Sequence, residues 1–174
     1  MIIREAVSQD MQNVHEIYAH HVLHGAGTFE EAPPAIEEMQ RRHDAVGANG
    51  LPWLVADIDG ATAGYAYAQR YHARSGWRIT LEDSVYVAPK QMRMGVGRAL
   101  LGELIARCTA LDYREMIAVI GDSANTGSIR LHEAAGFVHA GLLKNVGVKF
   151  GQRLDVVLMQ RTLLKNTGTL DQPE

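Results

Sequence analysis

The stretch that decides the fold is residues 85–101, VYVAPKQMRMGVGRALL. A run typical of a strand ends before Pro89, and Gly95 and Gly97 then lead into an apolar, helix-like run. The first N–H groups of a helix lack intrahelical partners and carry the positive end of its dipole. Glycines at that point let a phosphate approach the backbone. The stretch predicts a strand, an anion-binding turn and a helix, although close helix–strand packing also explains the glycines.

The turn differs from two common nucleotide-binding motifs. No GxxxxGK[ST] sequence occurs, and no third glycine follows at residues 98–100. Arg93 and Arg98 add positive charge on either side of the glycines. These features favour a pyrophosphate ligand but argue against ATP and NAD.

Composition indicates one soluble globular domain. The chain has 174 residues, 47% hydrophobic and 21% charged, with a formal net charge of −3. No basic excess predicts a nucleic-acid partner, and no apolar run is long enough for a membrane partner. The first residues do not resemble a secretory signal, so we expect a cytoplasmic protein. We expect a single domain over 1–165 and a polar C-terminal tail over 166–174.

Periodicity predicts an α/β (α+β) fold. Ser8 is the expected N-cap of a first helix, and Pro33 and Pro34 are expected to open a second. Further helices are predicted over 95–111 and 125–135. Strands are predicted over 2–6, 53–58, 62–70, 77–87, 116–120, 137–148 and 153–163. This order favours a central sheet with helices on both faces.

Two motifs carry a resemblance to a known family. A glycine turn after a strand ending in V-x-P is similar to the pyrophosphate motif of the GNAT acetyltransferase superfamily. Asn125-x-x-Ser128-x-x-Leu131-His132-x-x-x-Gly136-Phe137 is similar to its second signature. The chain resembles this family over nearly its whole length, and most of all the phosphinothricin and methionine sulfoximine N-acetyltransferases. The blocks that carry this closer resemblance are 52–56, 80–87, 118–121, 128–133 and 146–151.

The sequence departs from the superfamily pattern at two positions. Met92 stands where the turn usually begins with Gln or Arg, so Gln91 or Arg93 is expected to supply the side-chain contact. His132 stands where most members have Tyr, but the phosphinothricin-type enzymes also carry His at this position.

The resemblance implies a mixed, mostly antiparallel sheet and acetyl-CoA as co-substrate. The amides of Tyr86 and Val87 are expected to pair with the pantetheine arm and to polarise the thioester carbonyl. Asn125 and Ser128 are expected near the same arm, and both residue types also suit a helix start. The expected acetyl-CoA-binding residues are Val85, Tyr86, Val87, Arg93, Met94, Gly95, Val96, Gly97, Arg98, Asn125 and Ser128.

The resemblance also implies the catalytic residues. An amine must lose a proton before it attacks a thioester, and Glu82 is the expected general base. Partial burial would raise the pKa of its carboxyl group. A solvated strand acid or a partner of an arginine is the alternative for Glu82, and Asp83, on the other strand face, is the weaker candidate. His132 is the expected acid for the departing thiolate.

A small amino-acid-like acceptor is expected to bind near Glu82 through its α-amine. Cations are needed for its acidic group, and the resemblance implies His72 and Arg74, although a loop arginine is commonly a solvated surface charge. The full set of expected acceptor-binding residues is Phe29, His72, Arg74, Trp77, Ser84 and Gly121.

Three histidines and one cysteine are candidates for a metal site or a reactive thiol. His20 and His24 lie one helical turn apart beside His21, but no third ligand is evident, so we expect a polar helix face and no metal. Cys108 falls at an apolar helical position and is expected in the core.

Two other functions stay open at this point. The acceptor could be a protein N-terminus or a polyamine, or the chain could be a non-catalytic acyl-CoA sensor. An acidic pocket would suit a polyamine, whereas Arg74 favours an acidic acceptor. The apolar strands over 137–163 favour a homodimer.

Overall fold

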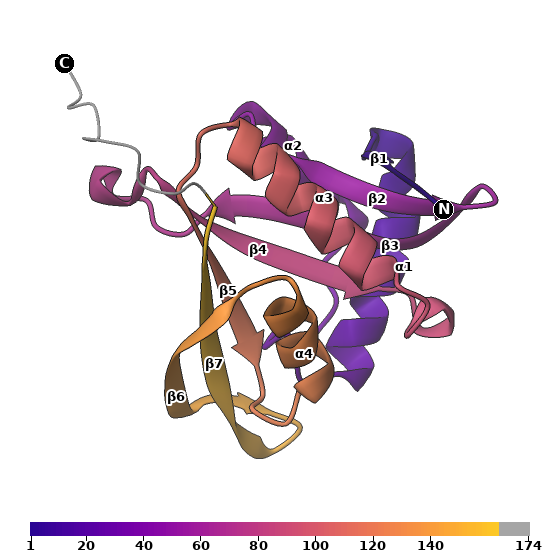
Figure 1. Cartoon of the computed structure of the whole chain (residues 1–174). Helices are drawn as coiled ribbons and strands as arrows, with labels where there is room; N and C mark the ends of the chain where they lie inside the picture. Colours follow the sequence, from indigo (N-terminus) through magenta and orange to yellow (C-terminus); the bar gives the residue numbers. More distant parts are fainter. Residues whose placement is uncertain (164–174) are drawn as a thin grey trace.

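The computed structural model describes residues 1–163 (Figure 1), so the tail predicted over 166–174 lies outside the described residues. The strands are β1 Ile2–Glu5, β2 Trp53–Ile58, β3 Ala61–Arg70, β4 Thr80–Val87, β5 Glu115–Gly121, β6 Val138–Lys149 and β7 Gln152–Thr162. The α-helices are α1 Met11–His24, α2 Ile36–Ala48, α3 Val96–Ala110 and α4 Thr126–Ala134. None of these helices has the length and apolar character needed to cross a membrane.

One seven-stranded sheet runs through this part of the molecule, in the order β1-β2-β3-β4-β5-β7-β6. Among the described strands, β4 and β5 alone pair in parallel, and the other neighbours are antiparallel. The expectation of a mixed, mostly antiparallel sheet is therefore confirmed.

The parallel pair is incomplete. The register joins Thr80–Asp83 of β4 to Glu115–Ala118 of β5 and then stops. Figure 1 shows the two strands starting side by side and then diverging, with β5, β7 and β6 turning away from the rest of the sheet. The last half of β4 therefore has one edge free of strand pairing toward β5.

Helices cover both faces of the sheet, as expected. α3 lies in front of it in Figure 1, where β3 presents small residues. A Cβ added to Gly64 would lie 3.1 Å from Val96 of α3. α1 and α2 lie behind, against an aromatic stack in which the rings of Trp53 and Tyr67 are 4.2 Å apart. The core on this side is thus aromatic, and on the α3 side aliphatic.

Three predicted element boundaries were wrong. The strand predicted from Trp77 begins only at Thr80, because residues 75–77 form a 3-10 turn closed by Arg78 N–H donating to Ser75 O. The second helix begins at Ile36, because Ala35 remains extended after the prolines.

Ser8 is not the cap of α1. A 3-10 turn over residues 8–10 precedes the helix, and the carboxylate of Asp10 accepts the amide of Val7 at 2.8 Å. Asp10 also pairs with Arg4 at 2.7 Å, which ties this turn to β1.

Candidate active site

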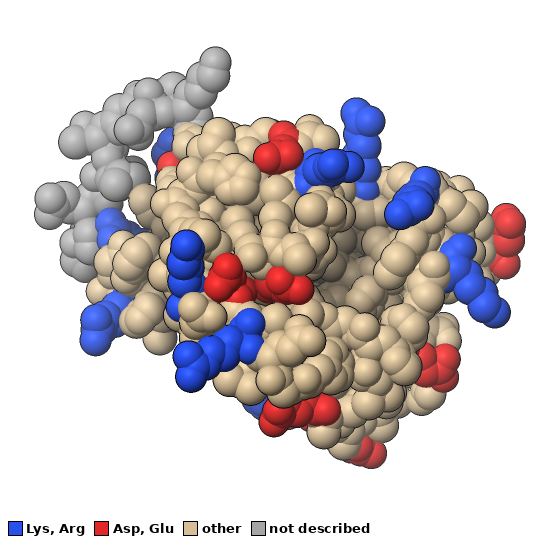
Figure 2. Space-filling model, turned by 90° about the horizontal axis from the view of Figure 1, so that it is seen from below, with Lys and Arg blue, Asp and Glu red and all other residues tan. Residues whose placement is uncertain are grey.

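A cleft of about 730 Å³ opens where β4 and β5 diverge. Its walls come from the end of β4, the start of α3, the middle of β5, α4 and the segment after α1. Figure 2, a view from below, shows the surface hollowed near its centre, with both basic and acidic side chains around the hollow. Arg93 and Arg98 line the cleft near the start of α3, so this part of it suits an anionic ligand.

The glycine turn forms the mouth of this cleft. Gly95 has a φ of +83°, in the left-handed region that favours glycine, and a Cβ there would meet no other atom. The first hydrogen bond of α3 runs from Ala99 N–H to the Gly95 carbonyl at 3.0 Å, so the preceding amides lie ahead of the helical ladder. The predicted strand, turn and helix are confirmed, and their geometry suits a phosphate.

Nearly all of the expected acetyl-CoA-binding residues meet at the cleft. Those that line it are Val85, Tyr86, Val87, Arg93, Gly95, Val96, Gly97, Arg98, Asn125 and Ser128. Met94 does not line it and is 62% exposed. Gln91 and Met92 also line it, and the buried Oε1 of Gln91 has no hydrogen-bond partner within residues 1–163.

Strand geometry distinguishes the amides at the end of β4. Ala88 N–H donates to the Ala63 carbonyl of the β3 edge at 2.9 Å. Because these directions alternate along a strand, the amide of Tyr86 also points toward β3. The amides of Val85 and Val87 point the other way, into the cleft. Of the two amides expected to pair with the pantetheine arm, that of Val87 faces the cleft and that of Tyr86 does not, while Val85 offers a further amide.

His21 contributes to the cleft, which the sequence reasoning missed. Its Nε2–H donates to the Val87 carbonyl at 2.9 Å, and the ring packs on Tyr86. Burial lowers the pKa of His21, an effect that the Val87 bond opposes, and the neighbouring His20 and Lys149 lower it further. Its spacing of four residues from Ile17, on the buried helix face, was the available signal.

Asn125 caps α4, which is one of the two roles expected of it. Its Oδ1 accepts the amide of Ser128 at 3.2 Å, which caps α4, and both residues face the cleft. The cap thereby fixes the start of the helix that carries His132.

Glu82 lies on the face of β4 that is turned toward α1 and α2. It does not line the cleft itself, and it pairs across the strands with Gln69. Burial raises the pKa of the Glu82 carboxyl, the charge of Asp83 raises it further, and a hydrogen bond from Gln69 opposes both. The expected direction of this shift is confirmed.

His132 lies on the opposite face of β4, with Asp83. Its Nε2 is 3.0 Å from Asp83 Oδ2, and its Nδ1–H donates to the Ser128 carbonyl at 2.7 Å. Burial alone would lower the pKa of His132, but the Asp83 carboxylate and the Ser128 carbonyl together raise it. Asp83, the weaker candidate from the sequence, is thus the direct partner of the expected acid.

The expected acceptor residues fall into separate groups. Ser84 lines the cleft. Phe29 packs between two strands, because a Cβ on Gly121 would lie 3.0 Å from its ring and one on Gly147 would overlap it. These two buried glycines therefore make the space that Phe29 occupies.

His72, Arg74 and Trp77 lie in the exposed segment between β3 and β4. The Trp77 ring packs on Tyr71 at 5.2 Å and near His72 at 6.0 Å, but none of the three expected residues lines the cleft. The segment enters β4 two residues before Glu82, so the sequence distance to the expected base is short.

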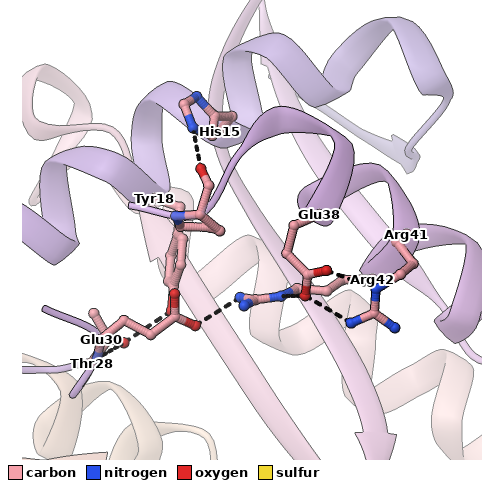
Figure 3. A network of polar contacts seen from close by, with 8 residues as sticks. His15, Tyr18, Thr28, Glu30, Glu38, Arg41 and Arg42 are labelled. Atoms are coloured by element: carbon pink, nitrogen blue, oxygen red, sulfur yellow. Dashed lines mark hydrogen bonds and ion pairs between the residues drawn. The ribbon is translucent and has the colours of Figure 1, made fainter. Parts of the chain in front are cut away.

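A polar network holds the segment that carries Phe29 (Figure 3). Arg42 of α2 pairs with Glu30 at 2.8 Å and with Glu38 at 2.9 Å. Tyr18 of α1 hydrogen-bonds to Thr28 at 3.0 Å. The Thr28 carbonyl also accepts Lys149 Nζ, from the buried end of β6, at 2.7 Å. These contacts join α1, α2 and β6 beside the cleft.

The histidines of α1 do not form a metal site within residues 1–163, where no cluster of three or more possible ligands occurs. The rings of His20 and His24 pack at 4.8 Å. Cys108 is fully buried, as expected, and burial followed by the charge of Asp83 raises the pKa of its thiol to about 12.

Comparison with known proteins gives a consistent result. The model of the acetyltransferase (GNAT) domain matches residues 3–158. The chain is 52% identical to the phosphinothricin N-acetyltransferase of Alcaligenes faecalis, over 99% of this chain and 86% of that protein. It is 37% identical to the L-methionine sulfoximine/L-methionine sulfone acetyltransferase of Salmonella typhimurium, over 94% and 95%.

A solved structure agrees with the described fold. The chain is similar to a GNAT superfamily phosphinothricin acetyltransferase from Sinorhizobium meliloti in complex with AcCoA, with a TM-score of 0.94 and 45% identity. The match covers 98% of this chain and 92% of that one. The fold, the cleft at the diverging strands and these matches agree, and the chain belongs to the GNAT acetyltransferase family.

Proposed function

We propose that the protein transfers the acetyl group of acetyl-CoA to the α-amine of a small amino-acid-like acceptor. The acceptor class is that of phosphinothricin, methionine sulfoximine and methionine sulfone. The observation that carries this proposal is the cleft between β4 and β5, which has a turn suited to a phosphate at its mouth and the paired Asp83 and His132 in its wall. The names of the similar enzymes support the acceptor class. In this proposal residues 1–165 act as one catalytic domain.

The donor binds along the cleft. The pyrophosphate lies at the turn, held by amides ahead of the α3 ladder and by Arg93 and Arg98. The amides of Val85 and Val87 meet the pantetheine arm and the thioester carbonyl. Asn125 and Ser128 contact the arm from the side of α4.

Glu82 removes the proton from the acceptor amine, directly or through water. Its raised pKa lies closer to the operating pH, which makes the carboxylate a better base. The amine then attacks the thioester directly. His132 is the acid that gives a proton to the departing thiolate.

The acidic group of the acceptor pairs with Arg74 and His72 in this proposal. Ser84 lies two residues beyond Glu82 on the same strand face, where it can bind the acceptor. Phe29 and Trp77 supply apolar walls, and Gly121 leaves room for the ring of Phe29.

The enzyme acts as a homodimer in this proposal. β6 is one of the two edge strands of the described sheet, and it exposes the apolar side chains of Val138, Leu142, Leu143, Val146 and Val148. A second copy would cover this surface.

Sedimentation velocity should give twice the 19.1 kDa mass, and Leu142→Lys should shift it to the monomer. Leu111→Lys, at an equally exposed leucine on another surface, should leave the dimer intact. A monomeric wild type contradicts the dimer.

A thiol-release assay tests the function. Acetyl-CoA is supplied with phosphinothricin, methionine sulfoximine, methionine sulfone, common amino acids, a polyamine and a peptide with a free N-terminus. We expect turnover of the first three acceptors at the highest kcat/KM. Preference for the peptide or the polyamine would overturn the acceptor class, and donor binding without thiol release over the whole panel would identify an acyl-CoA sensor.

A further inference from the structure

A buried pair, Asp83 and His132, joins β4 to α4 across 49 residues of sequence. The side chains are 1% and 5% exposed, and Nε2 lies 3.0 Å from Oδ2. Asp83 forms no ion pair with Lys or Arg within residues 1–163. The histidine is therefore the sole cationic partner of this carboxylate in the described part of the chain.

The hydrogen bonds of the ring fix where its protons lie. The Ser128 carbonyl, 2.7 Å from Nδ1, can only accept, so Nδ1 carries a hydrogen. Nε2 and Oδ2 would both be bare acceptors if no proton lay between them, and two buried acceptors at 3.0 Å repel each other. The pair consequently holds one proton between Nε2 and Oδ2.

Both residues line the cleft. Oδ1 of Asp83 is buried and has no hydrogen-bond partner within residues 1–163, so one oxygen of the pair remains available. The other titratable groups near the pair are Glu82, which precedes Asp83 on β4, and Cys108 of α3. The charge of Asp83 contributes to the raised pKa of the Cys108 thiol. Neither supplies a positive charge that would compete for the carboxylate.

We propose that Asp83 is a positioning residue that keeps His132 protonated and oriented, so that the pair supplies the proton for the departing CoA sulfur. This inference rests on the proposed acetyl transfer. The amine forms the C–N bond, the C–S bond breaks with its electron pair going to sulfur, and the proton between Nε2 and Oδ2 passes to that sulfur. The products are the amide, the neutral thiol, a neutral imidazole and the Asp83 carboxylate. The pair then regains a proton from water, which balances the proton that Glu82 takes from the amine and releases to water.

The first test follows the ring by nitrogen NMR on the full chain labelled with ¹⁵N-histidine. The signal of His132 is assigned by its absence from the His132→Gln spectrum. In the wild type, His132 should titrate above its ordinary pKa of 6.5, because the carboxylate favours the charged ring. In Asp83→Asn it should titrate below that value, because burial then acts without an anion.

Asp10→Asn is the matched control. Counted over the whole residue, Asp10 and Asp83 are each 6% exposed, and each has a charged or titratable partner, but Asp10 pairs with Arg4 outside the cleft. The control should leave the titration of His132 unchanged. A wild-type His132 that titrates at or below the ordinary value would overturn the proposal, whether or not the Asp83 variant folds.

The second test is kinetic. Asp83→Asn should lower kcat by about 10-fold to 100-fold, up to the lower end of the roughly 10²-fold to 10⁴-fold that general acid catalysis contributes, because the ring itself remains. The KM for acetyl-CoA should stay within about twofold, and the alkaline limb of the kcat profile should move to lower pH. A lower kcat with an unchanged pH profile would indicate a structural role and overturn the proposal. If the wild type acetylates no acceptor, the proposed function fails, but the NMR titration still decides the state of the pair.

Discussion

The two faces of β4 carry different chemistry. On the face toward α1 and α2, Glu82 pairs across the strands with Gln69, and burial raises the pKa of its carboxyl group. On the face toward α3 and α4, Asp83 is paired with His132, and the carboxylate raises the pKa of the ring against the effect of burial. One strand therefore carries, on opposite faces, a carboxyl group suited to taking a proton and the aspartate that pairs with His132 of α4, a histidine suited to giving one.

The separation of these groups has a functional consequence. A glutamate and a protonated histidine on the same face could form an ion pair, which would lower the pKa of the glutamate and weaken it as a base. Alternation along β4 puts Glu82 and Asp83 on opposite sides, so His132 pairs with the aspartate. Substitutions that change one face of β4 at a time test this difference.

The largest effect is expected for Glu82→Gln. Loss of the base should lower kcat at neutral pH by about 10²-fold to 10⁴-fold, with partial recovery at high pH, where the free amine becomes more abundant. Because the wild-type pKa is raised, the acid limb of its kcat/KM profile should lie above the ordinary value of 4.5, and the variant should lack this limb. Stopped-flow measurement of thiol release over pH gives both results.

Glu103→Gln, at a surface glutamate of α3 paired with Arg107, is the control and should behave as the wild type. If the Glu82 variant retains full activity at neutral pH, the base assignment is wrong and the contrast between the two faces has no catalytic meaning.

An intermediate effect is expected for Arg74→Gln. If the acceptor binds on the Glu82 face with its acidic group at Arg74, loss of this cation should raise the acceptor KM by about 10-fold or more, the range of a charge-assisted hydrogen bond. The KM for acetyl-CoA should not change. Initial rates at varied acceptor concentration measure the effect, and Arg78→Gln, in the same exposed segment, is the control. Equal effects of both variants on the acceptor KM would show that Arg74 contributes only a general surface charge and does not bind the acceptor.

The smallest effect is expected for Gly95→Val, which changes the cleft mouth and neither face. The φ of +83° is strained for valine by about 1–2 kcal/mol, and relief of the strain would move the amides that face the phosphate. Acetyl-CoA should bind about 10-fold more weakly by calorimetry. Gly60→Val, at a φ of +82° in the β2–β3 turn, imposes the same strain elsewhere and should not alter donor binding. Equal donor affinity in both variants contradicts the phosphate-binding role of the turn.

Local sequence signals accounted for much of the fold and of the donor side. The turn glycine, the Asn125 cap and the order of strands and helices follow from short-range backbone preferences. The wrong boundaries near Trp77 and Pro33 arose where a turn competed with a regular element over a few residues.

The sequence by itself determined that a glycine turn suited to a phosphate follows β4 and that Glu82 and Asp83 alternate across the strand, because periodicity and helix-end chemistry are local. The tertiary structure alone decided where β4 and β5 part, that His21 reaches the Val87 carbonyl, and that Asp83 meets His132. Alternation tells which face a side chain takes, but packing between distant segments decides what it meets there.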